Sequence, residues 1–567
     1  MSLYSMGLSA INTANTKLNT TANNINNADT EGYSRQTVVV TTAGAVNTGN
    51  GYVGQGVKVE TVSRQNNSYV QNQLASATSS QAEASTYNTE ISQIDNLLGS
   101  SDEGISPALQ DYYSSVQAVA SQPSDTASRQ EMLGQAENLT AQITSTQNTL
   151  NEQYDNVNTQ IDSLVDQANG YLEQIAELNE EITAAYASSS GQAPNHLLDE
   201  RDQMVLNLNE IVGVKTTSNG NSIDVTTANG QVLVSGSTVY PLEAVQSSQD
   251  PTRTTVAYTT PVTTTDSATG NKSTDLMAIE FDESKLSGGS LSGLLSFRSE
   301  SLDETRNDLG LLTAGIALNY NEINNAGYTL DGQAGGDIFS IGEPVVYANS
   351  KNQGDAQVTA SFSDASKLTG ADYDIRYDQA SGYTITNLKD GSSNTYSASA
   401  GTVELDGLSI SLPDPTSQTV ASGDSWSLQP TRNGASTLQV TLTDPNGIAA
   451  SSVADEKTNN SNALKMAQLQ TDKSMSQGDG DAATQTLTDI YTQIVNKVGV
   501  DAQSSNSSLT VADSLLDQRV SEQQSISGVN LDEENIDLLQ FEEQYQAASQ
   551  LITVANELFD TILALGS

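Results

Sequence analysis

Residues 136–178 read AENLTAQITSTQNTLNEQYDNVNTQIDSLVDQANGYLEQIAEL and carry a largely apolar side chain at every seventh position. The repeating positions are Ala136, Ile143, Leu150, Val157, Leu164, Tyr171 and Leu178. Such a row lets one helix bury a stripe against other helices. It predicts a helix from about Asp125 to about Ser188, and at about 1.5 Å per residue this helix would be roughly 95 Å long. The stretch therefore predicts a rod-shaped domain.

Both ends of the chain carry the same seven-residue period. The N-terminal row is Tyr4, Ile11, Leu18 and Ile25, and Gly7, Ala14, Thr21 and Ala28 follow it by three positions. The C-terminal rows are Leu531, Leu538, Tyr545, Ile552 and Phe559, and Phe541, Ala548, Ala555 and Ile562. Another row, Leu295, Leu302, Leu309, Ile316 and Ile323, predicts a further helix. We expect the two ends to pair as coiled-coil helices.

Two stretches between the helices are rich in Thr, Val, Ser and Gly, at about 215–281 and 356–430. In the first, Asn229-Gly230 lies between short alternating runs and predicts a hairpin with a type I′ turn. In the second, the alternating apolar residues are Tyr373, Ile375 and Tyr377, then Leu408, Ile410 and Leu412. Alternation with a period of two predicts β-strands.

These patterns predict an α+β multidomain protein, a discontinuous helical rod with two inserted β-rich domains. The rod consists of coiled-coil termini and long helices. The expected parts are a terminal coiled-coil domain (1–35 and 531–567), a helical rod domain (36–214, 291–340 and 441–530), a first β insertion (215–290) and a second β insertion (341–440).

The composition excludes several classes of function. The 567 residues include 69 Asp and Glu against 22 Lys and Arg, a formal net charge of −47, so phosphate backbones and anionic lipid would repel the protein. With no cysteine and one histidine, disulfides, thiol nucleophiles and sites with two histidines are excluded. No apolar run is long enough to span a bilayer as a helix, and the first residues lack the pattern of a cleaved secretory signal.

Four local features could suggest chemistry, and each has a structural explanation. The GxGxxG pattern of Gly49, Gly51 and Gly54 precedes an alternating strand, so we expect a hairpin there. Asp479 and Asp481 begin like a calcium loop, but its twelfth position is not glutamate. We expect His196 to be a surface or capping residue and Trp426 to be a core aromatic of a β domain. We predict no catalytic, cofactor-binding or metal-binding residue.

The terminal helices have too little apolar surface to be firmly ordered by pairing only with each other. Ordering their backbones costs conformational entropy that a single apolar seam barely offsets. Neighbouring copies would bury further faces, which predicts self-assembly. The expected assembly residues are Tyr4, Ile11, Leu18, Ile25, Leu538, Phe541, Tyr545, Ile552, Phe559 and Ile562.

The segment NNINNADTEGYSRQ (23–36) resembles the N-terminal signature of the bacterial flagellar axial proteins of the rod, hook and hook-associated group. Its first residues end a helix, Gly32 permits a turn and Tyr33 begins an extended segment. The segment SGVNLDEE (527–534) is similar to the closing motif of the same group. The signature residues are Asn23, Asn24, Ala28, Gly32, Tyr33, Arg35, Gly528, Val529 and Asn530.

Four further segments narrow the resemblance to the hook-associated protein 1 family. They are SPALQDYY (106–113), LLDERD (197–202), GLLSFR (293–298) and GDSW (423–426). The resemblance implies a secreted structural protein without catalysis or cofactor, exported unfolded by the flagellar type III apparatus to form a ring at the hook–filament junction of the extracellular flagellum. Its implied partners are copies of itself, hook protein, hook-associated protein 3 and an export chaperone at the C-terminal helix, with no nucleic acid and no membrane.

Two alternative functions remain open at this point. A flagellin-like filament subunit is the first, although flagellins lack the NNINNADTEGYSRQ turn. A surface adhesin or enzyme function of a β insertion is the second. No constellation of residues supports catalysis, whereas binding to a host surface stays open.

Overall fold

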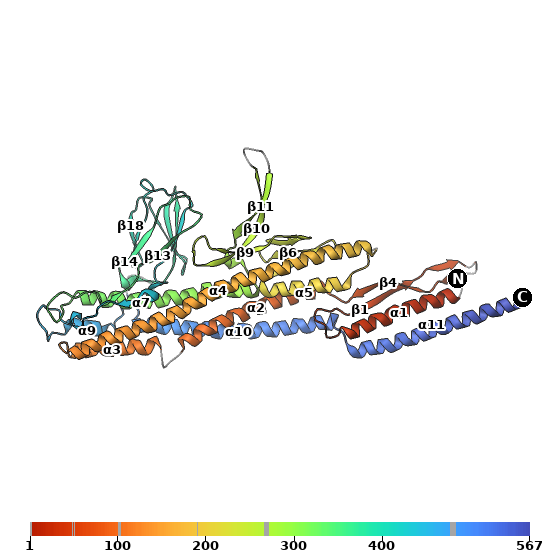
Figure 1. The fold of residues 1–567 in the computed structure, drawn as a ribbon, viewed down its shortest axis with the longest axis horizontal. Helices are drawn as coiled ribbons and strands as arrows, with labels where there is room; N and C mark the ends of the chain where they lie inside the picture. Colours follow the sequence, from red (N-terminus) through yellow and green to blue (C-terminus); the bar gives the residue numbers. More distant parts are fainter. Residues whose placement is uncertain are drawn as a thin grey trace.

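The structure, a computed structural model, describes residues 3–47, 49, 51–99, 104–189, 191–265, 272–476 and 483–566. Long helices run side by side in an elongated rod, β-rich parts project from one flank, and both chain ends lie at one tip (Figure 1). The predicted α+β multidomain class is confirmed. Asp479 and Asp481 lie outside the described residues.

The rod brings together helices from distant parts of the chain, and each of these helices contributes buried apolar residues to one continuous core. They are α2 (Ser68–Leu98), α3 (Ile105–Ser121), α4 (Thr126–Ser188), α5 (Asn195–Ile211), α6 (Gly289–Ser296), α7 (Asp303–Asn325), the short α8 (Gly434–Thr437), α9 (Ser461–Gln468) and α10 (Leu487–Ser527). Helix α10 packs along α2, and α4 packs against α3 and α5.

The long helix predicted from residues 136–178 is confirmed as α4, which has 63 residues. Its N-terminus is capped by Asp125, whose carboxylate accepts a hydrogen bond from the Ser128 backbone N–H at 2.9 Å. The buried stripe moves off the seven-residue row toward the C-terminus, where Val165 and Leu172 are buried. An α-helix has 3.6 residues per turn, so a strict seven-residue row drifts around a straight helix.

The row that starts at Leu295 also lies in a helical segment, because α6 and α7 are joined by a π-helical stretch, Phe297–Leu302. Leu295, Leu302, Leu309 and Ile316 are buried, and Ile323 is half-buried. This segment runs through the middle of the rod (Figure 1).

The first β region consists of a four-stranded and a three-stranded sheet. Its strands are β5 (Val214–Asn219), β6 (Ser222–Thr227), β7 (Val232–Ser235), β8 (Thr238–Val239), β9 (Leu242–Gln246), β10 (Thr254–Thr265) and β11 (Lys272–Glu280). The hairpin at Asn229-Gly230 is confirmed, but the type I′ turn is wrong. Only Gly230 has a positive φ, and the strand register shifts after Val225, which indicates a bulged turn.

The second β region contains a five-stranded and a three-stranded sheet. Its strands are β13 (Val345–Ala348), β14 (Thr359–Phe362), β15 (Tyr373–Asp378), β16 (Gly382–Asn387), β17 (Ser393–Tyr396), β18 (Thr402–Leu405), β19 (Leu408–Ser411) and β20 (Ser425–Gln429), with the short pair β12 (Phe339–Ser340) and β21 (Gln439–Val440) beside them. Trp426 is a buried core residue, as predicted, and its ring N–H donates to the Ala356 carbonyl at 3.2 Å.

The terminal part contains α1 (Leu3–Asn26), α11 (Leu531–Gly566) and an antiparallel ribbon. The ribbon is formed by β1 (Gln36–Thr42), β2 (Ala45–Asn47), β3 (Tyr52–Gly54) and β4 (Val57–Arg64). The hairpin expected at the GxGxxG pattern is therefore confirmed. Because β1 and β4 pack on α1, we propose that the ribbon belongs with the terminal helices, whereas the predicted boundary at residue 35 assigns it to the rod domain.

Candidate assembly site at the chain ends

Helices α1 and α11 form an antiparallel pair whose axes come close together. A Cβ atom at Gly7 would lie 2.6 Å from Cγ1 of Ile552, and the Lys17 ammonium lies 4.7 Å from the centre of the Phe541 ring. The buried row of α1 contains Gly7, Ala14 and Thr21. Small side chains at the contact let α11 approach the backbone of α1.

The larger residues of the predicted N-terminal row lie beside this contact. Among the proposed assembly residues, Ile11, Leu18, Ile25, Leu538, Phe541, Tyr545 and Ile552 are half-buried, and Tyr4, Phe559 and Ile562 are exposed. The exposed fractions of Phe559 and Ile562 are 62% and 67%. The row three positions later, which contains Gly7, Ala14 and Thr21, is buried and lies closer to α11 than the Tyr4 row does.

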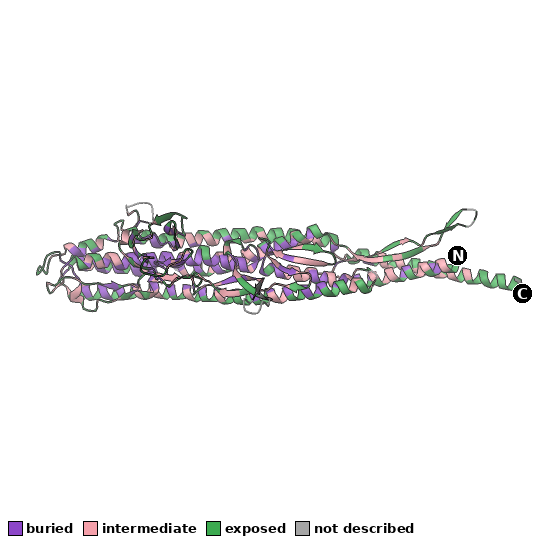
Figure 2. Cartoon of the chain, turned by 90° about the horizontal axis from the view of Figure 1, so that it is seen from above, coloured by how far each residue is buried: buried purple, intermediate pink, exposed green. Residues whose placement is uncertain are grey.

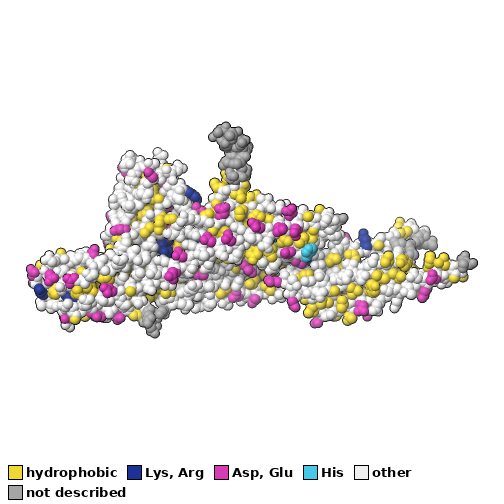
Figure 3. All heavy atoms as spheres, viewed as in Figure 1, with side chains coloured by type: hydrophobic (Ala, Val, Ile, Leu, Met, Phe, Trp, Pro, Cys, Tyr) yellow, Lys and Arg dark blue, Asp and Glu magenta, His cyan; other side chains and the backbone are white. Residues whose placement is uncertain are grey.

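Further apolar side chains of the terminal pair are exposed and were not among the predicted assembly residues. They are Leu3, Leu8, Leu531, Ile536, Leu539, Leu551, Val554, Leu558, Leu563 and Leu565. Figure 3 shows hydrophobic side chains gathered over this tip of the molecule. Exposed apolar patches of this kind mark interaction surfaces. The sequence signal was available, since α11 carries apolar residues on more faces than two rows describe.

The family signature residues form the joint between the terminal pair and the rod. Asn24 is buried; its side-chain amide donates to Glu534 at 3.0 Å and to the Gln36 carbonyl at 2.9 Å, and its side-chain carbonyl accepts from the Gln36 N–H at 3.0 Å. Arg35 donates from Nε to Oε1 of Glu534 at 2.6 Å. Glu534 is only 2% exposed, so its charge is held by two partners from the N-terminal signature.

The remaining signature residues fix the turns on either side of the joint. Gly32 has a φ of +76°, and a Cβ there would lie 2.9 Å from Oε1 of Gln203. The Tyr33 hydroxyl donates to Asn24 at 2.8 Å and accepts from the side-chain amide of Asn23 at 3.0 Å. Burial, with the nearby charge of Asp199, raises the pKa of Tyr33 to about 12.

The C-terminal signature separates α10 from α11. Gly528 caps α10 through its backbone N–H, which donates to the Gln524 carbonyl at 2.8 Å. The side chain of Asn530 accepts from the Asp532 N–H at 3.0 Å at the start of α11. Ala28 and Val529 line a polar cavity of about 1060 Å³ between the two turns, α2, α5 and α10.

The joint is tied to the rod through α5. Asp199 accepts from the Ser34 backbone N–H at 3.2 Å and pairs with Arg64 at 2.8 Å, and Arg64 also pairs with Asp202 at 2.7 Å. These contacts explain the LLDERD segment, which carries both carboxylates on the first turns of α5. They orient the ribbon and the terminal pair relative to the rod.

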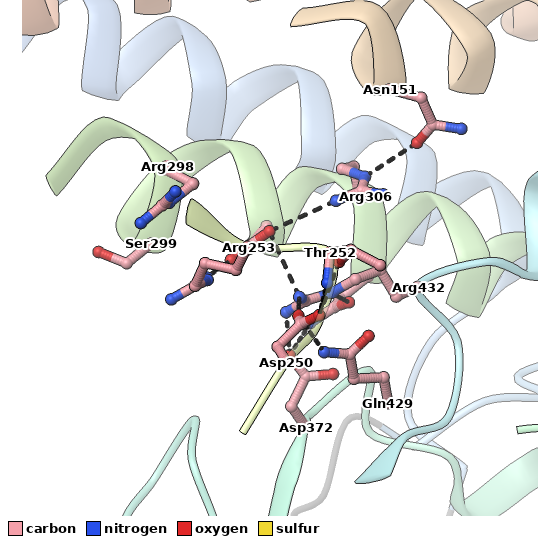
Figure 4. A network of polar contacts seen from close by, with 12 residues as sticks. Asn151, Asp250, Thr252, Arg253, Arg298, Ser299, Arg306, Asp372, Gln429 and Arg432 are labelled. Carbon is pink, nitrogen blue, oxygen red and sulfur yellow. Dashed lines mark hydrogen bonds and ion pairs between the residues drawn. The ribbon is translucent and has the colours of Figure 1, made fainter. Parts of the chain in front are cut away.

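A second polar cluster lies inside the rod, where the two β regions meet it (Figure 4). Asp303 of α7 pairs with Arg253, and it lies 3.5 Å from both Arg306 and Arg432. Asp372 of the second β region also pairs with Arg432. The cluster therefore connects α7 with both β regions.

Other polar groups complete this cluster. Arg298 pairs with Glu283 at 2.7 Å and donates to Asn158 of α4 at 2.8 Å. Burial would raise the pKa of Asp303, but the surrounding guanidinium groups, Arg432 first, hold it below its usual value. Because its carboxylates and guanidinium groups are paired with one another, we interpret the cluster as structural.

The described residues contain no cluster of His, Cys, Asp and Glu that could hold a metal ion. His196 is exposed at the start of α5, as predicted. Among the helices of the described residues, none combines the length and hydropathy needed to cross a membrane.

Both ends of the chain match families of flagellar axial proteins. Residues 5–33 match the flagella basal body rod protein family, and residues 521–565 match the C-terminal family of the flagellar basal body rod FlgEFG proteins. Residues 91–339 match the helical domain of flagellar hook-associated protein FlgK, and residues 347–430 match the D2-like domain of flagellar hook-associated protein 1. These matches, together with terminal helices that pair at one end of a helical rod, place the chain among the flagellar axial proteins.

Full-length relatives specify the family further. The chain is 37% identical to flagellar hook-associated protein 1 of Escherichia coli strain K12 over 565 residues, and 38% identical to that of Salmonella typhimurium strain LT2 over 572 residues, with 99% of each chain covered in both cases. The flagellar hook junction protein FlgK from Burkholderia pseudomallei has a TM-score of 0.71 at 27% identity, covering 80% of this chain and 100% of that one. The chain therefore belongs to the family of flagellar hook-associated protein 1. This membership decides against the alternative of a flagellin-like filament subunit.

Proposed function

We propose that the protein is a structural subunit of the bacterial flagellum that joins hook and filament and assembles with copies of itself through α1 and α11. The observation that carries this proposal is the exposed apolar surface of the terminal pair, which includes Phe559 and Ile562. A surface of this kind is stabilised when other subunits cover it. Family membership supports the same function.

We further propose that it contacts hook protein on one side and hook-associated protein 3 on the other. The protein is exported unfolded to the outside of the cell, and an export chaperone covers the apolar faces of α11 before export. The absence of cysteine from the sequence suits a chain that is exported unfolded and reduced. No catalytic step is proposed, because the carboxylates of the rod cluster are held in ion pairs.

The assembly surface can be tested with Ile552→Asp, since Ile552 lies half-buried against Gly7. In the monomer the half-buried position keeps a carboxylate there partly hydrated, whereas neighbouring subunits that cover the α1–α11 contact would remove this water at a high cost in free energy. We expect the variant to fold with near-normal helicity and thermal unfolding but to fail to dock on isolated hooks. Purified protein is added directly to the hooks so that chaperone binding plays no part.

Leu388→Asp is the matched control, because Leu388 is 59% exposed in the second β region, away from the terminal pair. It adds the same charge to an exposed apolar site and should dock normally. Normal docking by Ile552→Asp would contradict the proposed assembly surface. A surface adhesin function of the β insertions stays a hypothesis, and no contact among the described residues supports it.

A further inference from the structure

The ribbon formed by β1 to β4 has an apolar surface that no described part of the chain covers. Its strands β1 and β4 continue through β2 and β3, and the described residues of 45–54 are all exposed. The exposed apolar side chains of the ribbon are Val39, Val40, Val46, Tyr52, Val53 and Val57. Tyr52 is 77% exposed and Val53 is 53% exposed.

One side of the ribbon is held against α1. The Ser9 hydroxyl donates to the Val57 carbonyl, and a Cβ at Gly56 would lie 3.4 Å from Cγ of Met6. A two-stranded ribbon is marginally stable in water unless an apolar face is packed. Strands β2 and β3 extend beside the tip of the terminal pair (Figure 1), and a partner from outside the chain would supply the packed apolar face that they lack among the described residues.

The distribution of charge along the chain indicates which partner the ribbon would contact. Residues 1–64 contain four basic and three acidic residues, a net charge of +1, whereas residues 531–567 contain eight acidic and no basic residues. The remaining residues carry −47 − 1 + 8 = −40. A second copy's α11 would therefore be repelled by most of the molecule and least by the N-terminal segment.

We propose that the outer face of the ribbon is the docking surface for α11 of a neighbouring copy of this chain. The contact is heterologous, with the ribbon of one subunit against α11 of the next, so it can repeat around a ring. The exposed leucines and valines of α11 cover Val46 and Val53, which are paired across β2 and β3 and so share one face of the ribbon. The ribbon also contributes Lys58, which is exposed on β4, to a segment that repels the acidic α11 less than the rest of the molecule does; Glu542 and Glu557 are exposed on α11. This inference rests on the proposed self-assembly and adds a specific pair of surfaces to it.

The absence of native cysteine permits a direct test by disulfide cross-linking. V53C is mixed with single-cysteine variants along α11, namely L539C, L551C, L558C and L565C, and each mixture is docked on isolated hooks and oxidised. We expect a disulfide-linked dimer of two different variants with at least one position of α11, and none when V53C is docked alone. A V53C dimer as the sole product, or no mixed dimer although the mixture docks, would overturn the proposal.

A second test measures the energetic contribution of the ribbon. Val53→Asp adds a charge to the proposed contact, and Val453→Asp adds the same charge to a rod residue that is 45% exposed. We expect Val53→Asp to lower the amount of hook-bound protein by about tenfold or more, a difference of about 1.4 kcal/mol, while the Val453 variant docks normally. Circular dichroism checks that both variants keep the helical content of the parent chain.

The two proposals fail in different ways. If Ile552→Asp fails to dock and Val53→Asp docks normally, assembly through the terminal helices stands and the ribbon contact is wrong. If both dock normally, the proposed self-assembly through this end of the molecule is wrong as well.

Discussion

The rod and the terminal pair are both built from long helices, yet they bury their apolar residues to very different extents. In α4, Ile143, Leu150 and Val157 are each 0% exposed. In the part of α11 whose side chains the structure describes, only Ala548 and Glu534 are buried. Figure 2 shows buried residues concentrated along the rod and exposed residues along the end of α11.

This difference shows that the two regions are stabilised in different ways, the rod by contacts within one chain and the terminal pair in part by contacts with other subunits. The rod core is completed within one chain, so its stability is a property of the monomer. The terminal pair has one seam with small residues and leaves most of its large apolar side chains in water. Its full stability therefore depends on surfaces supplied by neighbouring subunits.

Amide exchange should show this contrast most strongly. We expect the backbone amides of α1 and α11 to exchange rapidly in a dilute, verified monomer, while those of α4 are protected. A difference of about 4 kcal/mol in opening free energy would separate the exchange rates by about a thousandfold. Hydrogen–deuterium exchange with mass spectrometry measures both regions in one sample.

Protein docked on hooks is the control for that experiment, because neighbouring subunits should slow exchange in both terminal helices. Strong protection of α1 and α11 in the free monomer would contradict the interpretation that the pair depends on assembly.

The polar cluster of the rod provides a second contrast, now between buried and exposed charges. Asp303→Asn removes a carboxylate that faces Arg253, Arg306 and Arg432, and it leaves their charges buried without a full partner. We expect a loss of about 3–5 kcal/mol in the free energy of unfolding, measured by denaturant titration. Arg376→Gln breaks a pair whose arginine is 65% exposed, and it should cost less than about 1 kcal/mol.

Titration with acid gives the same cluster an independent test. Burial tends to raise the pKa of Asp303, but its guanidinium neighbours outweigh that effect and lower it. A carboxylate whose pKa is lower in the folded state than in the unfolded state stabilises the fold at pH values above its unfolded-state pKa. This stability is lost as the pH falls through its folded-state pKa. Asp303→Asn should therefore weaken the acid dependence of unfolding, and an unchanged dependence together with unchanged stability would contradict the structural role.

Sequence periodicity was sufficient to predict the long helix but not every contact along it. The predicted helix extends from about Asp125 to about Ser188, because a row with a seven-residue period forms one buried stripe only on a continuous helix. The row could not show that burial shifts to Val165 and Leu172, because that depends on how straight the helix is. At the N-terminus, the row of large apolar residues did not indicate which positions lie closest to α11, because the closest approach is at Gly7.

The polar features were less predictable because their members come from distant parts of the chain. The signature residues Asn24 and Arg35 were recognised by resemblance, but nothing in the sequence indicated that Glu534 is their shared partner. In the rod cluster, Asp303 and Arg432 are brought together only by the fold. Arg298 and Arg306, which accompany an apolar helical row, were the signal that could have indicated a buried charged cluster.

The smallest expected effects concern glycines, one in a rod helix and one in the terminal pair, and they affect different properties of the protein. Gly134 of α4 has open space where a Cβ would lie. Gly134→Ala should stabilise the rod by about 0.5–1 kcal/mol, because alanine loses less backbone entropy in a helix.

Gly7→Ala has the same intrinsic preference, but its Cβ would lie 2.6 Å from Cγ1 of Ile552 and would push α11 away. Thermal unfolding should therefore rise slightly for Gly134→Ala and stay unchanged for Gly7→Ala, while docking on isolated hooks falls only for Gly7→Ala. If Gly7→Ala docks as well as the parent chain, close packing of α1 against α11 is not needed for assembly, and the small-residue row has no role in it.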